Sequence, residues 1–205
     1  MELKERVLNA ARELFFTYGL RNVRMDEIAT QLGISKKTLY EVFPKKKDIV
    51  NEITKDFLKC RENEQEILAR EANDPVDELI KILGSIHTIF ESMNARLIYE
   101  LQRYFPEAWQ IFKKHKEEFV LKGIVDNLKQ GIEHGLYRKE IDVAIIARMR
   151  VEQIQTAMDP TIFSPDQFNI KEIHNQLLLQ YIHGISTAKG HELIKRYLKL
   201  NDEVI

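Results

Sequence analysis

The stretch GISKKTLYEVFPKKKDIV, residues 33–50, decides the fold predicted for this chain; it holds five lysines, two acidic residues and one tyrosine. Ser35 is well placed as the N-cap of a helix, and Leu39 and Phe43 have the spacing of its inward face. A shorter helical pattern ends just before it at Gly33, a residue type that commonly stops helices. Two short helices joined by a tight turn are the layout of a helix-turn-helix unit.

The second helix of this unit has a polar face that suits DNA. The face carries Lys37 and Glu41, with Thr38 and Tyr40 beside them. In the major groove lysine donates to guanine, threonine donates or offers its methyl group, and glutamate accepts from cytosine. A tyrosine hydroxyl and the lysines at positions 45–47 suit phosphate oxygens, which position a protein without reading sequence. An ordinary solvated surface is the alternative, because lysine-rich turns are common on proteins that bind no DNA.

Charge is distributed unevenly along the 205 residues. Residues 1–50 hold ten basic and seven acidic residues, a net charge of +3, whereas the rest of the chain carries −4. A basic segment attached to an acidic body indicates that only one end meets a polyanion. The single cysteine and the lack of any apolar run of membrane-spanning length favour a reducing cytoplasm as the compartment.

Helical periodicity extends through the chain and predicts an all-α fold, since few glycines and prolines interrupt it. An amphipathic helix precedes the helix-turn-helix pair and stops at Gly19. Asp74 and Pro75 suit the N-cap and the first position of a later helix. Further helices are expected near residues 46–70, 75–92, 94–104, 106–134, 142–157 and 167–188, with a short terminal helix after Gly190.

This region also resembles a known family. IATQLGISKKTLYEVFPKKKDI, residues 28–49, is closely similar to the DNA-binding segment of the TetR/AcrR family of one-component regulators, commonly written I-A-x-x-x-G-[IV]-S-x-x-T-[LI]-Y-x-x-F-x-x-K-x-x-[IL]. With the preceding helix, the resemblance covers about residues 5–50. Eleven positions fit the pattern in one frame: Ile28, Ala29, Gly33, Ile34, Ser35, Thr38, Leu39, Tyr40, Phe43, Lys46 and Ile49.

The resemblance implies which residues meet DNA. Lys36, Lys37, Thr38 and Tyr40 fall where members of the family contact DNA, and Lys46 falls on a lysine that contacts phosphate. It also implies two domains, a helix-turn-helix domain over residues 1–48 and a helical effector-binding and dimerisation domain over residues 49–205.

One position departs from the family pattern. Arg24 stands where the family usually has a threonine that caps the second helix and contacts phosphate. Because an arginine side chain cannot accept the capping hydrogen bond, the helix start is expected to depend on Asp26 and Glu27 near its positive end. Arg24 remains a candidate for a phosphate contact.

The resemblance implies a ligand pocket and a homodimer for the rest of the chain. The pocket candidates are aromatic and Met residues that suit an adaptable apolar cavity: Phe90, Met93, Tyr99, Phe105, Trp109 and Phe112. The dimer-interface candidates lie on the last two long helices: Ile145, Met149, Leu177, Leu178, Tyr181 and Ile185. At helical spacing, both sets are also compatible with the core of a single protomer, which is the alternative for each.

The sequence offers no recognisable catalytic or metal-binding motif. Its six histidines are scattered, and neither a nucleophile elbow nor a phosphate-cradling glycine loop is present. No catalytic residue, metal or cofactor is therefore expected. The predicted function is a ligand-responsive homodimeric repressor of transcription that binds a palindrome in double-stranded DNA and answers to an unknown small molecule. The alternatives are a sequence-specific DNA-binding protein without an effector and, less favoured, a helical enzyme or adaptor.

Overall fold

The structure, a computed structural model, describes the backbone of residues 2–92 and 96–201 and the side chains of residues 2–89 and 96–199. Within these ranges the regular structure is helical, and an isolated antiparallel bridge joins Tyr137 and Ser186. The predicted all-α fold is confirmed. None of the described helices is long and apolar enough to cross a membrane.

The helix boundaries agree closely with the predicted ones, except in the middle and at the end of the chain. A π-helical turn, Lys116–Val120, divides the segment expected as one helix over residues 106–134. Asp74 caps its helix as predicted, because its Oδ1 accepts from the backbone N–H of Val76 at 2.9 Å and of Asp77 at 3.0 Å. The order is α1 (Leu3–Tyr18), α2 (Met25–Leu32), α3 (Lys36–Val42), α4 (Lys46–Glu71), α5 (Pro75–Ser92), α6 (Leu97–Tyr104), α7 (Pro106–His115), α8 (Leu121–Glu133), α9 (Val143–Ala157), α10 (Ile170–Ile185) and α11 (Ala188–Asn201).

The chain forms two compact units. Unit 1 comprises residues 1–61 and 90–115, and unit 2 comprises residues 62–89 and 116–205. The predicted domain boundary after residue 48 lies inside unit 1, because α6 and α7 belong to the same compact unit as the helix-turn-helix pair. The predicted boundary separates a DNA-binding domain from an effector-binding and dimerisation domain, and it remains a prediction.

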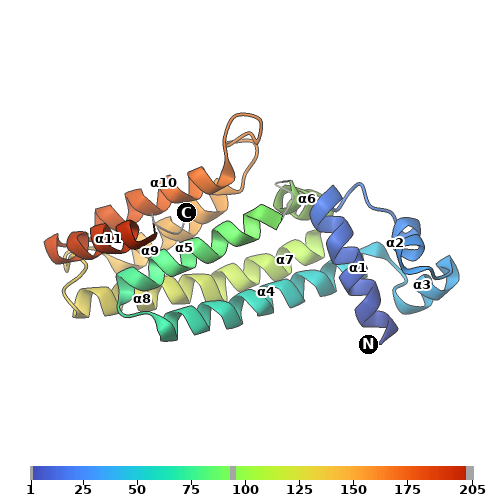
Figure 1. Ribbon diagram of the computed structural model, residues 1–205, viewed down its shortest axis with the longest axis horizontal. Coiled ribbons are helices and arrows are strands. Elements are labelled where there is room, and N and C mark those ends of the chain that lie inside the picture. The colour runs from blue at the N-terminus through green and yellow to red at the C-terminus, as the bar shows by residue number, and fades with distance from the viewer. Residues whose placement is uncertain (1, 93–95, 202–205) are drawn as a thin grey trace. The chain divides into compact units, whose positions relative to one another are not determined.

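Unit 1 is built around the inward faces of the first three helices (Figure 1). Phe15 of α1, Ile28 of α2 and Leu39 of α3 are fully buried and belong to one apolar cluster. Ile49 of α4 and Trp109 of α7 extend that cluster. The apolar spacing that predicted an inward face for each helix is therefore confirmed for the three N-terminal helices.

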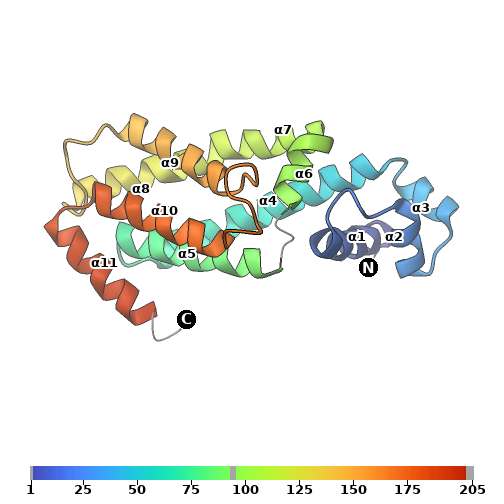
Figure 2. The same cartoon turned by 90° about the horizontal axis from the view of Figure 1, so that it is seen from above.

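Unit 2 is a helical bundle in which α8, α9 and α10 lie alongside one another in both views (Figures 1 and 2). Gly131 of α8 lets the ring of Tyr137 pack directly against the helix, because a Cβ at this position would lie 1.9 Å from the ring. The hydroxyl of Tyr137 donates to the carbonyl of Pro75 at 3.0 Å and lies 3.1 Å from Oδ1 of Asn127. The ring therefore anchors the end of α8 to the start of α5.

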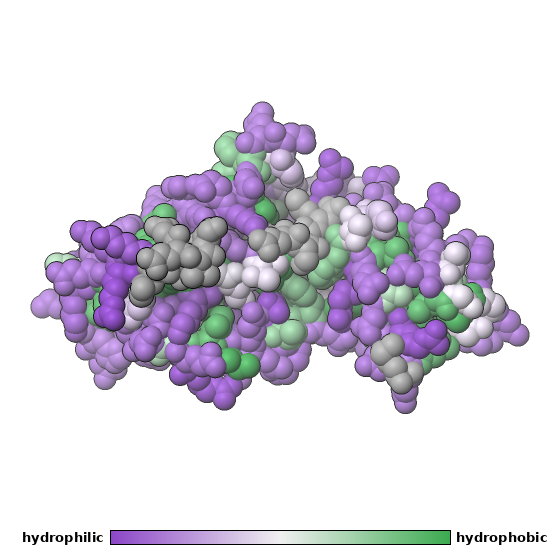
Figure 3. Space-filling view, in the orientation of Figure 1, coloured by the Kyte–Doolittle hydropathy of each residue, from purple (hydrophilic) through white to green (hydrophobic). Residues whose placement is uncertain are grey.

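The prediction that Gly190 separates two helices is wrong. Gly190 lies inside α11, and a Cβ there would come within 2.3 Å of the carbonyl oxygen of Leu136. The glycine thus permits a close helix contact and does not interrupt the helix. On the face shown in Figure 3, hydrophilic residues cover most of the surface, and hydrophobic residues form smaller groups between them.

Candidate nucleic-acid interface and cavity

The turn between α2 and α3 is made by a glycine and a serine. Gly33 ends α2 with φ 65° and ψ 30°, a left-handed conformation that a Cβ disfavours. The next amide, that of Ile34, donates to the carbonyl of Ala29 at 3.1 Å and closes the turn. Ser35 then caps α3 as predicted, since its Oγ accepts from the backbone N–H of Thr38 at 3.1 Å.

The start of α2 is stabilised by an acidic residue of its first turn. The carboxylate of Glu27 accepts from the backbone N–H of Arg24 at 2.6 Å. This contact is the reciprocal half of a capping box. The helix therefore depends on Glu27, as the sequence predicted for a chain with arginine at this position, and the Arg24 side chain is left exposed.

The outward face of α3 presents polar side chains to solvent. The side chain of Lys37 is 88% exposed, and its only ion pair among the described residues is one of 4.0 Å with Glu41. Lys36 pairs with Asp26 of α2 at 2.5 Å, and Tyr40 is also exposed. Exposed ion pairs of this kind contribute about 0.2–1 kcal/mol, so they exchange readily for contacts with bases or phosphates.

Lys46 has a different environment from the lysines of α3. Its ammonium donates to the backbone carbonyls of Leu20 and Val23 and lies over the ring of Phe15, 5.5 Å from the centroid. Burial lowers the pKa of Lys46, and the nearby carboxylate of Glu100 opposes that shift. The lysine therefore joins the start of α4 to the loop between α1 and α2.

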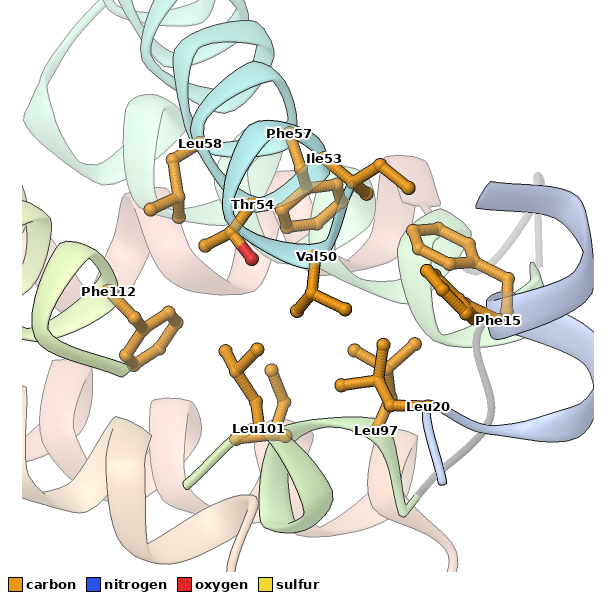
Figure 4. Close-up of a pocket in the computed structure, with 12 residues that line it drawn as sticks. Phe15, Leu20, Val50, Ile53, Thr54, Phe57, Leu58, Leu97, Leu101 and Phe112 are labelled. Carbon is orange, nitrogen blue, oxygen red and sulfur yellow. The ribbon is translucent and has the colours of Figure 1, made fainter. Parts of the chain in front are cut away.

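A small apolar cavity in unit 1 is lined by residues of α1, α4, α6 and α7. Its volume is about 40 Å³, and Val50 of α4 points across it toward Leu97 and Leu101 of α6 (Figure 4). Thr54 supplies the only side-chain oxygen among its lining residues. A void this apolar stays dry, and it is too small for a drug-sized molecule.

Unit 2 contains a much larger cavity, of about 550 Å³. Its size falls within the range of natural small-molecule sites. Apolar side chains of α5 and α10, among them Leu79, Leu83 and Leu178, form part of the wall. The polar side chains that line it include Glu78, Asn127, Arg150, His174 and Tyr181.

Burial changes the proton affinity of several groups in this cavity. It lowers the pKa of the Arg150 guanidinium to about 10 and the pKa of His174 to about 4. Burial also raises the pKa of Glu78, although Asn127 donates a hydrogen bond to its carboxylate at 2.7 Å. The Arg150 guanidinium stacks over the ring of Tyr181, 5.0 Å from the centroid.

The comparison with protein families identifies the N-terminal region. Residues 7–53 match the family model described as "Bacterial regulatory proteins, tetR family". The repressor KstR2 of Mycolicibacterium smegmatis is 25% identical over 193 residues, which cover 91% of this chain and 92% of KstR2. The N-terminal region of the chain belongs to the TetR family. It is a DNA-binding transcriptional regulator.

Solved structures of regulators share the fold of this chain. A regulator from Saccharomonospora viridis in complex with choline has a TM-score of 0.72 at 18% identity, covering 90% of this chain and 97% of that one. FadR from Bacillus subtilis in complex with stearoyl-CoA has a TM-score of 0.67 at 18% identity, covering 88% and 98%. The likeness of fold therefore extends over both units of this chain.

The structure brings most of the predicted DNA-binding residues of the TetR-family helix-turn-helix together. Lys36, Lys37, Tyr40 and Glu41 are exposed on α3, and Thr38 is partly exposed. In the structure the ammonium of Lys46 is directed to backbone carbonyls, as described above. The contacts of all these residues with DNA remain predictions.

The predicted pocket residues do not line the large cavity. Tyr99, Phe105, Trp109 and Phe112 belong to unit 1, where the last three pack in or against the core beneath the helix-turn-helix. Helical spacing alone could not separate this core from a ligand site. Met93 and the side chain of Phe90 lie outside the described residues.

The predicted dimer-interface residues fall into two groups. Ile145 and Met149 of α9 are 58% and 54% exposed, so a second chain can reach them. Three others, Leu178, Tyr181 and Ile185, are at most 8% exposed within the single chain, and their place in an interface remains a prediction. These three side chains pack into the apolar core of unit 2. Leu177 is partly buried.

Sequence reasoning missed the polar residues of the large cavity. The signal was present in α9, where Arg150 lies on the same helical stripe as the apolar Ala147, Val151 and Ile154. A charged residue within an apolar stripe indicates either a buried ion pair or a binding site. His174 interrupts the inward stripe of α10 in the same way.

Proposed function

We propose that this chain is a homodimeric repressor that reads a palindromic operator with α3 and leaves it when a small molecule fills the cavity of unit 2. The observation that carries the proposal is the exposed polar face of α3. Lys37, Tyr40 and Glu41 project from a short helix whose opposite side is fixed by buried Leu39. A rigid helix with a polar outer face is suited to the major groove, where those side chain types read base edges.

A dimer is part of the proposal because one helix-turn-helix makes few base contacts. Such proteins commonly bind two half-sites about 34 Å apart, one for each recognition helix. The exposed Ile145 and Met149 support this, since they are four residues apart on one face of α9. Large apolar side chains in such a position favour burial by a second chain.

The effector part of the proposal is supported by the large cavity and by the relatives. FadR from Bacillus subtilis was solved with stearoyl-CoA, and the Saccharomonospora viridis regulator with choline. In this chain a cavity of about 550 Å³ offers comparable room for a small molecule. A ligand that binds the DNA-free conformation more tightly shifts the population away from DNA.

Selection of bound fragments from a random DNA pool tests the proposal. The wild type is expected to enrich an inverted repeat, and Lys37→Ala and Tyr40→Phe to weaken the binding or alter the selected sequence. Lys139→Ala is the matched control, because Lys139 is exposed in unit 2 and should leave the selected sequence unchanged. Failure of the wild type to enrich any sequence at low salt, after refolding to remove bound ligand, would contradict the proposal.

Release of the selected DNA by added compounds separates the first alternative, and DNA affinity separates the second. A DNA-binding protein without an effector would enrich an inverted repeat, but no compound would release it. A helical enzyme or adaptor would show no saturable, salt-sensitive affinity for DNA. The proposed role also implies a location beside the chromosome, in the cytoplasm.

A further inference from the structure

The large cavity of unit 2 contains a cation that no described acid neutralises. Arg150 of α9 is 7% exposed, and none of the described carboxylates forms an ion pair with it. Its guanidinium lies over the ring of Tyr181 in a cation–π contact. A buried charge without an ionic partner is costly, so natural proteins retain it mainly where a ligand or a second charge completes the pair.

Two further donors lie at the same place. The hydroxyl of Tyr181 is buried and has no hydrogen-bond partner among the described residues, and the side chain of Tyr181 is 8% exposed. The imidazole of His174 is 3% exposed and lines the same cavity. Its neighbours Arg150 and His87 add to the effect of burial in lowering the pKa of His174, so the ring is neutral at pH 7. The net charge of this group of side chains is therefore +1, from Arg150 alone.

We propose that Arg150, together with the Tyr181 hydroxyl and the His174 ring, binds the carboxylate of a monoanionic ligand whose apolar body fills the rest of the cavity. A planar guanidinium matches a carboxylate through two parallel hydrogen bonds. A charge of −1 neutralises the buried charge of Arg150, whereas a diphosphate would bring excess negative charge into a buried site. The apolar wall formed by residues such as Leu79, Leu83 and Leu178 suits a hydrocarbon or aryl body.

The acidic residues of the cavity do not contradict an anionic ligand. Glu66, Glu118 and Asp126 also line it, but all three are exposed. Exposed charges are screened by salt over about 8–10 Å, so they disfavour a bound anion much less than buried Arg150 favours it. Glu78 is half-buried, and the amide of Asn127 already binds its carboxylate.

The test compares acids with neutral amides of the same shape. The probes are dodecanoate with dodecanamide and naphthylacetate with naphthylacetamide, and calorimetry measures their binding to the full chain without DNA. At least one acid is expected to bind roughly tenfold or more tightly than its amide, as a hydrogen bond to a charged group implies. Equal binding of acid and amide in both pairs, or no binding of either acid, would overturn the proposal.

Variants of α9 and α10 identify the residues that bind the carboxylate. Arg150→Met and Tyr181→Phe are expected to remove most of the preference for acid over amide. Arg148→Met is the matched control, because Arg148 is on the same helix but is exposed and paired with Glu117 at 2.8 Å. An unchanged preference in Arg150→Met would overturn the proposal.

The ligand-free chain gives a second, independent measurement. If Arg150 is retained for a ligand, Arg150→Met should keep or raise the unfolding temperature without ligand, because a costly buried charge is removed. A fall of several degrees would instead assign Arg150 a structural role and overturn the proposal. This inference rests on the proposed function, since the cavity is taken as the effector site. Because both measurements omit DNA, their failure is distinguishable from a failure of the chain to bind an operator.

Discussion

Replacement of Lys46 by methionine separates two roles that the sequence cannot distinguish. The family pattern makes Lys46 a phosphate contact, whereas in the structure its ammonium donates to the carbonyls of Leu20 and Val23. Methionine keeps most of the aliphatic length and its contact with the ring of Phe15, but it removes the charge and both hydrogen bonds. Lys46→Met therefore tests the ammonium alone.

The expected loss of stability follows from these contacts. A hydrogen bond to a charged group contributes about 1.5–3 kcal/mol, and Lys46 makes two, so the gross loss is on the order of 3–6 kcal/mol. Part of this loss is offset, because the burial that lowers the pKa of Lys46 also costs solvation of the ammonium. The net destabilisation of unit 1 is expected to be about 2–3 kcal/mol.

Urea unfolding and the salt dependence of DNA binding measure the two roles separately. Trp109 is the only tryptophan and lies in the core of unit 1, so its fluorescence reports the unfolding of that unit. For Lys46→Met we expect the urea midpoint to fall, DNA affinity to fall for all sequences, and the slope of log K against log salt to stay unchanged. If the ammonium contacted phosphate in the complex, the slope would shrink by about 0.9.

The neighbouring lysine provides the control. Lys45 is exposed, and Lys45→Met should leave the urea midpoint unchanged. A shallower salt slope in Lys46→Met together with an unchanged urea midpoint would refute the reasoning from the structure and restore the phosphate contact.

Three other substitutions test the cap of α3, the cavity and the dimer. Ser35→Ala removes the acceptor for the Thr38 amide and should lower the stability of unit 1 by about 1 kcal/mol in the same urea titration, with weaker DNA binding. Burial raises the pKa of Glu78, so the folded chain retains a proton that the unfolded chain releases, and stability falls as the pH rises above about 4.3. Glu78→Gln should therefore raise the unfolding temperature at pH 7 but not at pH 3. Ile145→Glu should produce monomers in sedimentation and weaken operator binding. Ile162→Glu should do neither, because Ile162 is similarly exposed, at 54%, but lies outside α9.

The elements predicted best are those whose local signals all agree. At the α2–α3 turn, Gly33 accepts a left-handed conformation, Ser35 caps the next helix and buried Leu39 fixes its face. Each of these features depends on residues within one or two helical turns, so the sequence predicts it. Gly190 was misread because its role depends on the carbonyl of Leu136, which is more than fifty positions away in the chain.

The candidate sites also depend on contacts between residues that are distant in the sequence. The aromatic residues from Tyr99 to Phe112 suit a ligand pocket by type, yet Trp109 is buried in the core of unit 1. Conversely, Leu178 and Tyr181 suit a dimer interface by type, but they face the interior of unit 2. Apolar periodicity predicts that a face will be covered, and it carries no information on whether a ligand, a partner or the same chain covers it.

Three basic residues illustrate why positive charge alone does not indicate function. Lys37 is almost fully exposed and weakly paired, so it can exchange its partner for DNA at little cost. Lys46 is satisfied within the fold by two backbone carbonyls, so its removal acts first on stability. Arg150 is buried without an anion, and the cost of that arrangement is lowered only when a negative group enters the cavity. The same positive charge therefore implies recognition, support or ligand binding, according to what surrounds it.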